Sequence, residues 1–138
     1  MHNKELALDY VRRAQIRLRV LDVLYTAESW ADVVRESQEI VELTLKGLLR
    51  AYGIEPPRVH DVSALLLAEC GRLPRALQTQ LPRLAAISRD LRRDRELAFY
   101  GAEDLTPGSF YAREDADRAR SSATEAVTAV APHVLSNV

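Results

Sequence analysis

Apolar residues recur every three or four positions along most of the chain, which is the period of an amphipathic α-helix. The first such run follows Asn3, a residue type that caps helix starts, and continues to residue 25. The second run follows Ser29 and extends to Gly53, where a glycine can end a helix. The predicted apolar stripe of the first helix is Leu6, Tyr10, Ala14, Leu18, Leu21 and Tyr25, and that of the second is Trp30, Val33, Ser37, Ile40, Leu43 or Thr44, and Gly47 or Leu48.

The second half of the chain keeps this period between proline and glycine breaks. A proline pair at residues 56–57 enforces an extended connection, after which Asp61 can cap a short third helix. A longer helix is expected from Pro82 onward, a loop over residues 101–109, and a last helix whose end Pro132 kinks or frays. The apolar face of the longer helix is Leu84, Ile87, Leu91 and Ala98, and that of the last helix is Ala116, Ala119, Ala123, Ala126 or Val127, Val130 and Val134.

Strand signals are nearly absent. The sequence contains no sustained alternation of apolar and polar residues and no Asn-Gly or Asp-Gly hairpin turn. It also contains no internal repeat and no linker-like tract. We therefore expect an all-α fold, an antiparallel four-helix bundle with an additional short helix, in one domain that spans residues 1–138.

The charge balance excludes binding by bulk electrostatic attraction, because 19 basic and 20 acidic residues leave a net charge of −1. The single cysteine, Cys70, cannot form an internal disulfide, and one cysteine with three scattered histidines does not make a zinc motif. We expect Cys70 to be a small core residue in a reducing, cytoplasmic setting, with no metal and no cofactor. The N-terminus lacks a signal-peptide core and the longest apolar run is too short to cross a membrane, so no membrane partner is expected.

The densest chemical feature is the stretch of residues 83–95, where five arginines against two aspartates give a local net charge of +3. On a helix, Arg89, Arg93, Glu96 and Tyr100 are separated by four, three and four residues, so they share one face. One guanidinium group can donate two hydrogen bonds to the oxygens of a phosphate, and a phenol ring can stack on a base. This face is therefore a candidate nucleotide or RNA phosphate site. The alternative is a solvated face whose arginines pair with nearby carboxylates.

Three further features allow more than one interpretation. Residues 4–19 of the first helix also have a local charge of +3, so a groove lined by both arginine-rich helices would be basic. His60 is a secondary candidate as an acid, a base or a ligand, although a histidine before a short helix is more often a turn residue. Trp30 is expected to be a core or interface anchor.

Five segments of the chain carry a family likeness that runs almost from end to end. They are residues 7–10 (ALDY), 36–49 (ESQEIVELTLKGLL), 60–66 (HDVSALL), 95–101 (RELAFYG) and 111–116 (YAREDA). In their order and spacing these segments resemble the HEPN (higher eukaryotes and prokaryotes nucleotide-binding) domains. HEPN domains are small helical bundles, often encoded beside a minimal nucleotidyltransferase.

This resemblance implies a bundle that dimerises and binds nucleotide or RNA. Many toxin members cut RNA without a metal, through an Arg-polar-x-x-x-His pattern followed by a tyrosine. In this chain the first two positions of that pattern fall on Arg93 and Asp94 and its tyrosine on Tyr100, but its histidine position holds Ala98. A methyl group cannot transfer protons, so the resemblance implies a member that does not cleave RNA.

The favoured hypothesis is therefore a non-catalytic, HEPN-like nucleotide- or RNA-binding and protein-interaction module that binds through Arg89, Arg93, Glu96 and Tyr100. The resemblance implies a homodimer, with the first helix or the alanine-rich last helix as its self-complementary face. It also implies a minimal nucleotidyltransferase partner in a two-component, toxin–antitoxin-like system. One alternative is a metal-independent endoribonuclease toxin that uses another proton-transfer group, such as His60 or Tyr100. A second alternative is a purely structural dimeric scaffold that holds a partner enzyme.

Overall fold

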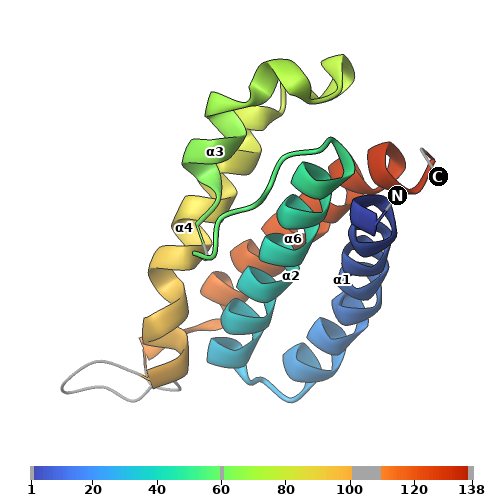
Figure 1. Cartoon of the computed structure of the whole chain (residues 1–138). Helices are drawn as coiled ribbons and strands as arrows, with labels where there is room; N and C mark the ends of the chain where they lie inside the picture. Colours follow the sequence, from blue (N-terminus) through green and yellow to red (C-terminus); the bar gives the residue numbers. More distant parts are fainter. Residues whose placement is uncertain (1, 60, 101–109, 137–138) are drawn as a thin grey trace.

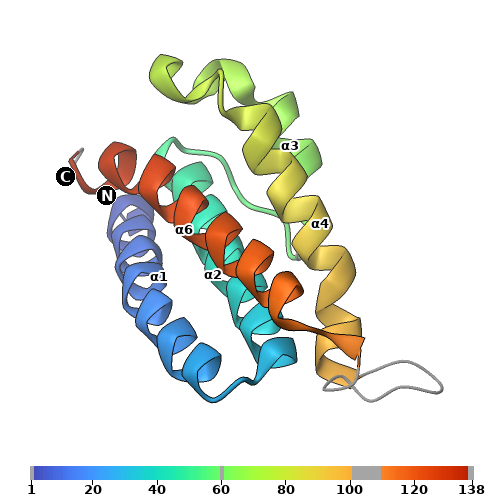
Figure 2. The same ribbon diagram turned by 180° about the vertical axis from the view of Figure 1, so that it is seen from behind.

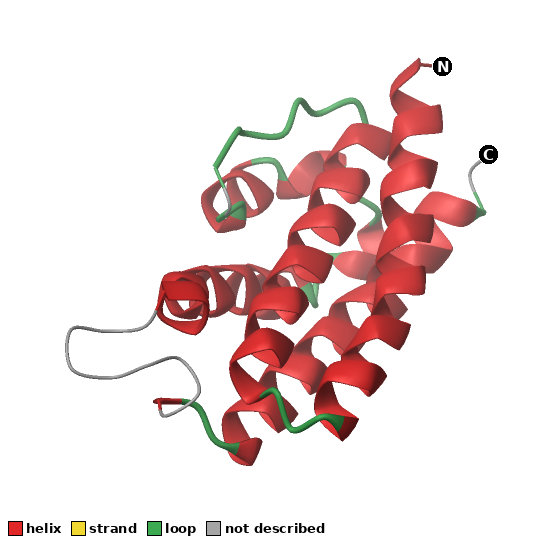
Figure 3. Cartoon of the chain, turned by 90° about the horizontal axis from the view of Figure 1, so that it is seen from below, coloured by secondary structure: helices red, strands yellow, loops and turns green. Residues whose placement is uncertain are grey.

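The computed structural model of the chain describes residues 2–59, 61–100 and 110–136, and for residues 2, 3 and 93–100 it describes the helical backbone only (Figure 1). The long helices are α1 (His2–Thr26), α2 (Trp30–Ala51), α4 (Leu81–Tyr100) and α6 (Arg113–Leu135). Between α2 and α4 lie the short helix α3 (Ser63–Ala68) and two 3-10 turns, Cys70–Arg72 and Arg75–Leu77. The predicted all-α bundle is confirmed, and Figure 3 shows helices and loops but no strand in the described ranges.

Helix α2 occupies the centre of the bundle. It packs against α1, α4 and α6, and α1 also packs against α6, whereas α4 touches α6 only lightly. Successive long helices run in opposite directions, and α1 and α4 lie on opposite sides of α2 in both ribbon views (Figures 1 and 2). Helix α3 packs against α4. In the described part of the chain, none of these helices is both long and apolar enough to cross a membrane.

The core is formed by the faces that the helical period predicts, most completely in α6. Every residue predicted on the α6 face is buried, and so are Leu84, Ile87 and Leu91 on α4. On α1 the buried face is turned from the predicted one, because Ala7 and Val11 are buried whereas Tyr10 is only half-buried. Other fully buried side chains of the core are Leu21, Ile40, Leu45, Leu48, Leu66 and Leu81.

Gly47 of α2 explains the rotation of α1. A Cβ atom at Gly47 would lie 3.0 Å from Cγ2 of Val11, 3.2 Å from Cβ of Tyr10 and 3.3 Å from the carbonyl oxygen of Ala7. The backbones of α1 and α2 therefore approach closely at this point, and small side chains on α1 suit the contact better than a phenol ring. The apolar period of the sequence does not include this constraint.

The helix ends confirm some predictions and correct others. Gly53 ends α2 with a positive φ of 75°, which a glycine adopts without steric cost. Ser29 occupies the N-cap position of α2, and its hydroxyl donates a hydrogen bond to the Asp32 carboxylate over 2.6 Å. The prediction for Asn3 is wrong, because α1 begins at His2. Asp61 precedes the N-cap of α3, which is Val62.

Three further expectations concern Cys70, Pro132 and the predicted loop. Cys70 begins a 3-10 turn and is exposed, so the prediction that it belongs to the core is wrong. Pro132 lies inside α6, which continues to Leu135. The loop predicted over residues 101–109 lies outside the described residues.

Candidate functional site

The predicted phosphate site lies on α4, which runs as one helix from Leu81 to Tyr100. This continuity keeps positions 89, 93, 96 and 100 along one side of the helix. Leu84, Ile87 and Leu91 are buried on the opposite side, which faces the core. The side chains of Arg93, Asp94, Glu96, Ala98 and Tyr100 lie outside the described residues, and so does His60.

Arg89 is the predicted site residue whose side chain is described. It is exposed, and no ion pair joins it to another residue in the described part of the chain. Its positive charge acts on the carboxylate of Asp61. Arg89 therefore keeps a solvent-facing guanidinium group, which is the state that binding of a phosphate requires.

Asp61 and Ser88 hold the segment before α3 against α4. The Asp61 carboxylate accepts hydrogen bonds from the backbone N–H of Ser63 over 2.9 Å and from the hydroxyl of Ser88 over 3.3 Å. The Ser88 hydroxyl in turn accepts a hydrogen bond from the N–H of Val62 over 3.1 Å. Burial raises the pKa of Asp61, but the hydrogen bonds from Ser63 and Ser88 and the charge of Arg89 outweigh it, so the pKa lies below its ordinary value.

The hydrogen bonds of Asp61 with Ser63 and Ser88 place Asp61, the residue after His60, beside Arg89 of the predicted site. Asp61 and Ser88 are 27 positions apart in the sequence. The sequence reasoning treated His60 and α4 as separate features, and no pattern within either segment indicates that they meet. The available signals in the sequence were Asp61, the predicted cap of the third helix, and Ser88 next to Arg89.

A cleft of about 470 Å³ lies between α4 and α6. Its apolar residues include Ile87, Leu91 and Tyr111, and its arginines already have carboxylate partners. Arg83 lies 3.1 Å from Glu125, and Arg118 lies 2.7 Å from Asp115. Because Asp90 and Asp117 also line the cleft, the cleft is a poorer phosphate site than the side of α4 that carries Arg89.

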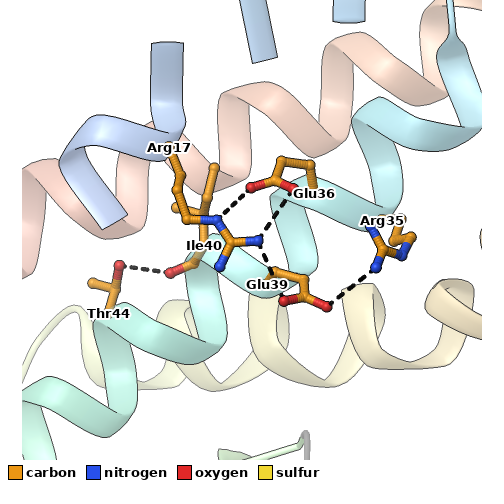
Figure 4. Close-up of polar contacts among 6 residues, drawn as sticks. All are labelled: Arg17, Arg35, Glu36, Glu39, Ile40 and Thr44. Atoms are coloured by element: carbon orange, nitrogen blue, oxygen red, sulfur yellow. Dashed lines mark hydrogen bonds and ion pairs between the residues drawn. The ribbon is translucent and has the colours of Figure 1, made fainter. Parts of the chain in front are cut away.

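One basic residue of α1, Arg17, contacts carboxylates of α2 across the helix interface (Figure 4). Nε of Arg17 lies 2.7 Å from Glu36, and Nη2 of Arg17 lies 3.4 Å from Glu39. Arg35 extends the network with a 3.9 Å contact to Glu39. The hydrogen bond with Glu36 raises the pKa of Arg17, against the effect of burial.

The arrangement of the helices tests the predicted basic groove between α1 and α4. Helix α2 lies between α1 and α4, so these two arginine-rich helices do not line one groove in the described part of the chain. Across the α1–α2 contact Glu36 of α2 neutralises Arg17 of α1, and within α2 Glu42 neutralises Lys46 over 2.8 Å. The sequence reasoning missed the Arg17–Glu36 pair because this pair depends on how two helices face each other.

Comparison with known protein families decides the class of the molecule. A family model for the HEPN domain matches residues 7–133, nearly the whole chain. The chain belongs to the HEPN family. The resemblance inferred from the five sequence segments is thereby confirmed, and membership indicates a nucleotide- or RNA-binding module. Searches of curated proteins and of solved structures found no significant match.

At one end of the HEPN bundle, arginines stack on aromatic rings. Tyr25 and Trp30 make an edge-to-face contact with ring centroids 5.0 Å apart. Arg120 lies 4.6 Å from the centre of the Tyr25 ring, and Arg113 lies 5.3 Å from that of Trp30. A hydrogen bond with Asp117 raises the pKa of Tyr25. Trp30 is partly buried and packs against the core, as expected for an anchor residue.

The described residues of the HEPN domain do not bring three histidine, cysteine, aspartate or glutamate side chains together as a metal site would require. Arg89 on α4 is exposed and has no ion-pair partner in the described ranges, a state that it shares with Arg12, Arg19 and Arg92. What distinguishes Arg89 is its register with positions 93, 96 and 100 along one side of α4.

Proposed function

We propose that this HEPN domain is a nucleotide- or RNA-binding and protein-interaction module that does not cleave RNA, and that it binds phosphate through α4. One observation carries the proposal. Arg89 is exposed and unpaired among the described residues, on a continuous helix that keeps position 89 in register with positions 93, 96 and 100. Guanidinium groups in this register can bind successive phosphates or one phosphate from two directions, and Tyr100 adds a stacking surface.

The absence of RNA cleavage follows from the residue at position 98. The family pattern uses a histidine there, and this chain has alanine. Cleavage of RNA needs proton transfer to or from ribose and leaving-group oxygens, and a methyl group offers no proton. Arginines 89 and 93 retain the ability to bind phosphate, because binding needs charge and geometry but no proton transfer.

The proposal includes a homodimer and a minimal nucleotidyltransferase as partner protein, in a toxin–antitoxin-like pair. The association of HEPN domains with such enzymes supports this part. The setting we propose is the cytoplasm, a reducing compartment that suits a chain with one cysteine.

Titration of labelled nucleotides and short RNAs against the protein tests the binding site. We expect Arg89→Ala and the double variant Arg93→Ala, Tyr100→Ala to weaken binding about tenfold or more, since a hydrogen bond to a charged group contributes on the order of 2 kcal/mol. Arg19→Ala removes an exposed arginine from α1, on the other side of α2, and is the matched control. Equal affinity of the control and the α4 variants would contradict the site. Cleavage of RNA by the wild-type protein in the presence of EDTA would favour the ribonuclease alternative.

A further inference from the structure

The cleft between α4 and α6 combines an apolar floor with a polar rim. Its volume of about 470 Å³ lies in the range of small-molecule sites. The space exists because α4 and α6 touch only lightly, whereas both pack closely against α2. The floor consists of side chains that are each at most 6% exposed, namely Val34, Ile87, Leu91, Tyr111 and Ala119.

The rim of the cleft carries more negative than positive charge. Its two arginines already pair with carboxylates, as described above, so their charges are cancelled. Two further carboxylates line the cleft from opposite helices, Asp90 on α4 and Asp117 on α6. Asp90 is exposed, and no ion pair joins either aspartate to another residue in the described part of the chain. The cleft therefore attracts cations.

The rim also offers open hydrogen-bond acceptors. The Tyr25 hydroxyl donates a hydrogen bond to Asp117, which raises the pKa of Tyr25 and keeps the phenol protonated. An ionised carboxylate has about four lone-pair sites, so one phenol leaves most of the acceptor capacity of Asp117 unused. Ser121 and Ser122 of α6 line the same cleft and add two hydroxyl groups.

These features favour an organic cation over an anion or a neutral apolar molecule. A phosphate or a carboxylate would meet two uncancelled negative charges. A neutral hydrocarbon would cover the floor but would also cover the carboxylates without giving them donors, which costs free energy. An ammonium or guanidinium group supplies both the charge and several N–H donors, and a hydrocarbon stem covers the floor.

We propose that the cleft between α4 and α6 binds a small organic cation, an amine or guanidine on an apolar stem. Asp90 and Asp117 hold the charged groups, and the stem lies on Ile87 and Leu91. Because two carboxylates are uncancelled, a diamine binds more tightly than a monoamine of the same length.

This site is separate from the proposed phosphate site on α4. Arg89 does not line the cleft, and it lies on the side of α4 opposite Ile87 and Leu91. The inference therefore does not rest on nucleotide binding. We expect Arg89→Ala to keep the wild-type affinity for amines, so the failure of one site is distinguishable from the failure of the other.

NMR titration of the nitrogen-15-labelled full chain with four probes of matched length tests the chemistry of the ligand. The probes are hexylamine, hexamethylenediamine, hexanol and hexanoate. We expect both amines to give saturable shifts at residues of the cleft, and the diamine to bind about tenfold more tightly, since it makes a second charge-assisted contact. Hexanol and hexanoate are expected to bind much more weakly. Equal binding of hexanol or hexanoate, or no saturable shift with either amine, overturns the proposal.

Substitution of the two aspartates tests the assigned residues. Asp90→Asn and Asp117→Asn each remove one charge at nearly constant size, and each is expected to weaken diamine binding about tenfold. Glu114→Gln is the matched control, because Glu114 is an exposed carboxylate of α6 that does not line the cleft. Equal losses in all three variants would show that the acidic surface as a whole attracts the amine, and would contradict the site.

A change that fills the cleft tests its location. Ser122→Phe places a ring in the cleft without changing any charge, and we expect it to abolish saturable amine binding with unchanged helical circular dichroism. Thr128→Phe adds a ring at an exposed position of α6 that does not line the cleft, and it is expected to bind amines like the wild type. A Ser122→Phe variant that keeps the wild-type affinity places the amines elsewhere and overturns the proposal.

Discussion

Arg17 of α1 bonds Glu36 of α2 across the helix interface, with 2.7 Å between Nε and Oε2 (Figure 4). Glu36 is only 7% exposed, so its carboxylate depends on this partner for neutralisation. An uncompensated charge in such a position costs much more free energy than an exposed one. The pair therefore links the packing of two helices to the stability of the whole bundle.

Replacement Arg17→Ala is expected to lower the free energy of unfolding by about 2 kcal/mol, because it leaves the Glu36 carboxylate without its closest cation. Arg13→Ala is the matched control. Arg13 lies 3.6 Å from Asp9 on the same helix, and both side chains are at least half exposed. Loss of this exposed pair is expected to cost about 0.5 kcal/mol or less. Urea denaturation of both variants makes the comparison, and similar losses would contradict a structural role for the Arg17–Glu36 pair.

Replacement Gly47→Leu is expected to destabilise the bundle by about 2 kcal/mol or more, because the new side chain must displace α1. The Cβ alone would lie 3.3 Å from the Ala7 carbonyl oxygen, which belongs to the helix backbone and cannot rotate away. Gly71→Leu has open space around its Cβ and is expected to change stability little. Thermal unfolding followed by circular dichroism measures both, and a Gly47→Leu variant as stable as Gly71→Leu would show that the two helices separate easily.

The hydrogen bonds of Asp61 with Ser63 and Ser88 predict how the free energy of unfolding depends on pH. The pKa of Asp61 is lowered in the folded state from an ordinary value of 3.8, so the folded chain binds fewer protons at this group than the unfolded chain. Its contribution is complete above pH 3.8 and is lost as the pH falls through the folded pKa. We expect Asp61→Asn to lower the free energy of unfolding by about 1 kcal/mol at pH 7 and by less at pH 2.5, since each hydrogen bond contributes about that amount.

Urea denaturation between about pH 2.5 and 7 measures the difference in the free energy of unfolding between the wild type and Asp61→Asn. This pH range brackets the ordinary carboxyl pKa. Glu55→Gln is the control, because Glu55 is an exposed carboxylate of the same connecting segment. Its effect on stability is expected to be small throughout this range. A gap between wild type and Asp61→Asn that does not narrow in acid would show that the contribution of Asp61 does not depend on the carboxylate charge.

Replacement Ala98→His restores the histidine of the family pattern. It tests whether the missing histidine accounts for the proposed lack of RNA cleavage. We expect the wild type to leave RNA intact in EDTA and the variant to cleave it, on the order of 100-fold or more above background, as general acid–base groups contribute. Adding Arg93→Ala to the variant is expected to abolish the cleavage. Ala76→His places the same group on an exposed 3-10 turn and is expected to leave RNA intact. Cleavage by the wild type would show that another group transfers the proton.

The local sequence contains most of the information about the helices. The period of Ala116, Ala119 and Ala123 predicts the buried face of α6, and Gly53 marks the end of α2. Both signals act within one helix or one turn, so neighbouring residues determine them. The prediction that Cys70 lies in the core assumed that the helical period continues after α3. In the structure two 3-10 turns follow α3 instead, and the thiol is exposed.

The sequence by itself determined that this chain forms an all-α HEPN bundle, that α4 carries arginines in helical register, and that Ala98 stands at the position of the family histidine. Only the tertiary structure decided which side chains meet across helices. In the folded chain Arg17 pairs with Glu36, and Asp61 accepts a hydrogen bond from Ser88. Helix α1 is oriented so that Ile16, Val20 and Val23 are exposed. The physical reason is that helical period depends on residues three or four positions apart, whereas contacts between helices depend on how closely two backbones approach, as they do at Gly47.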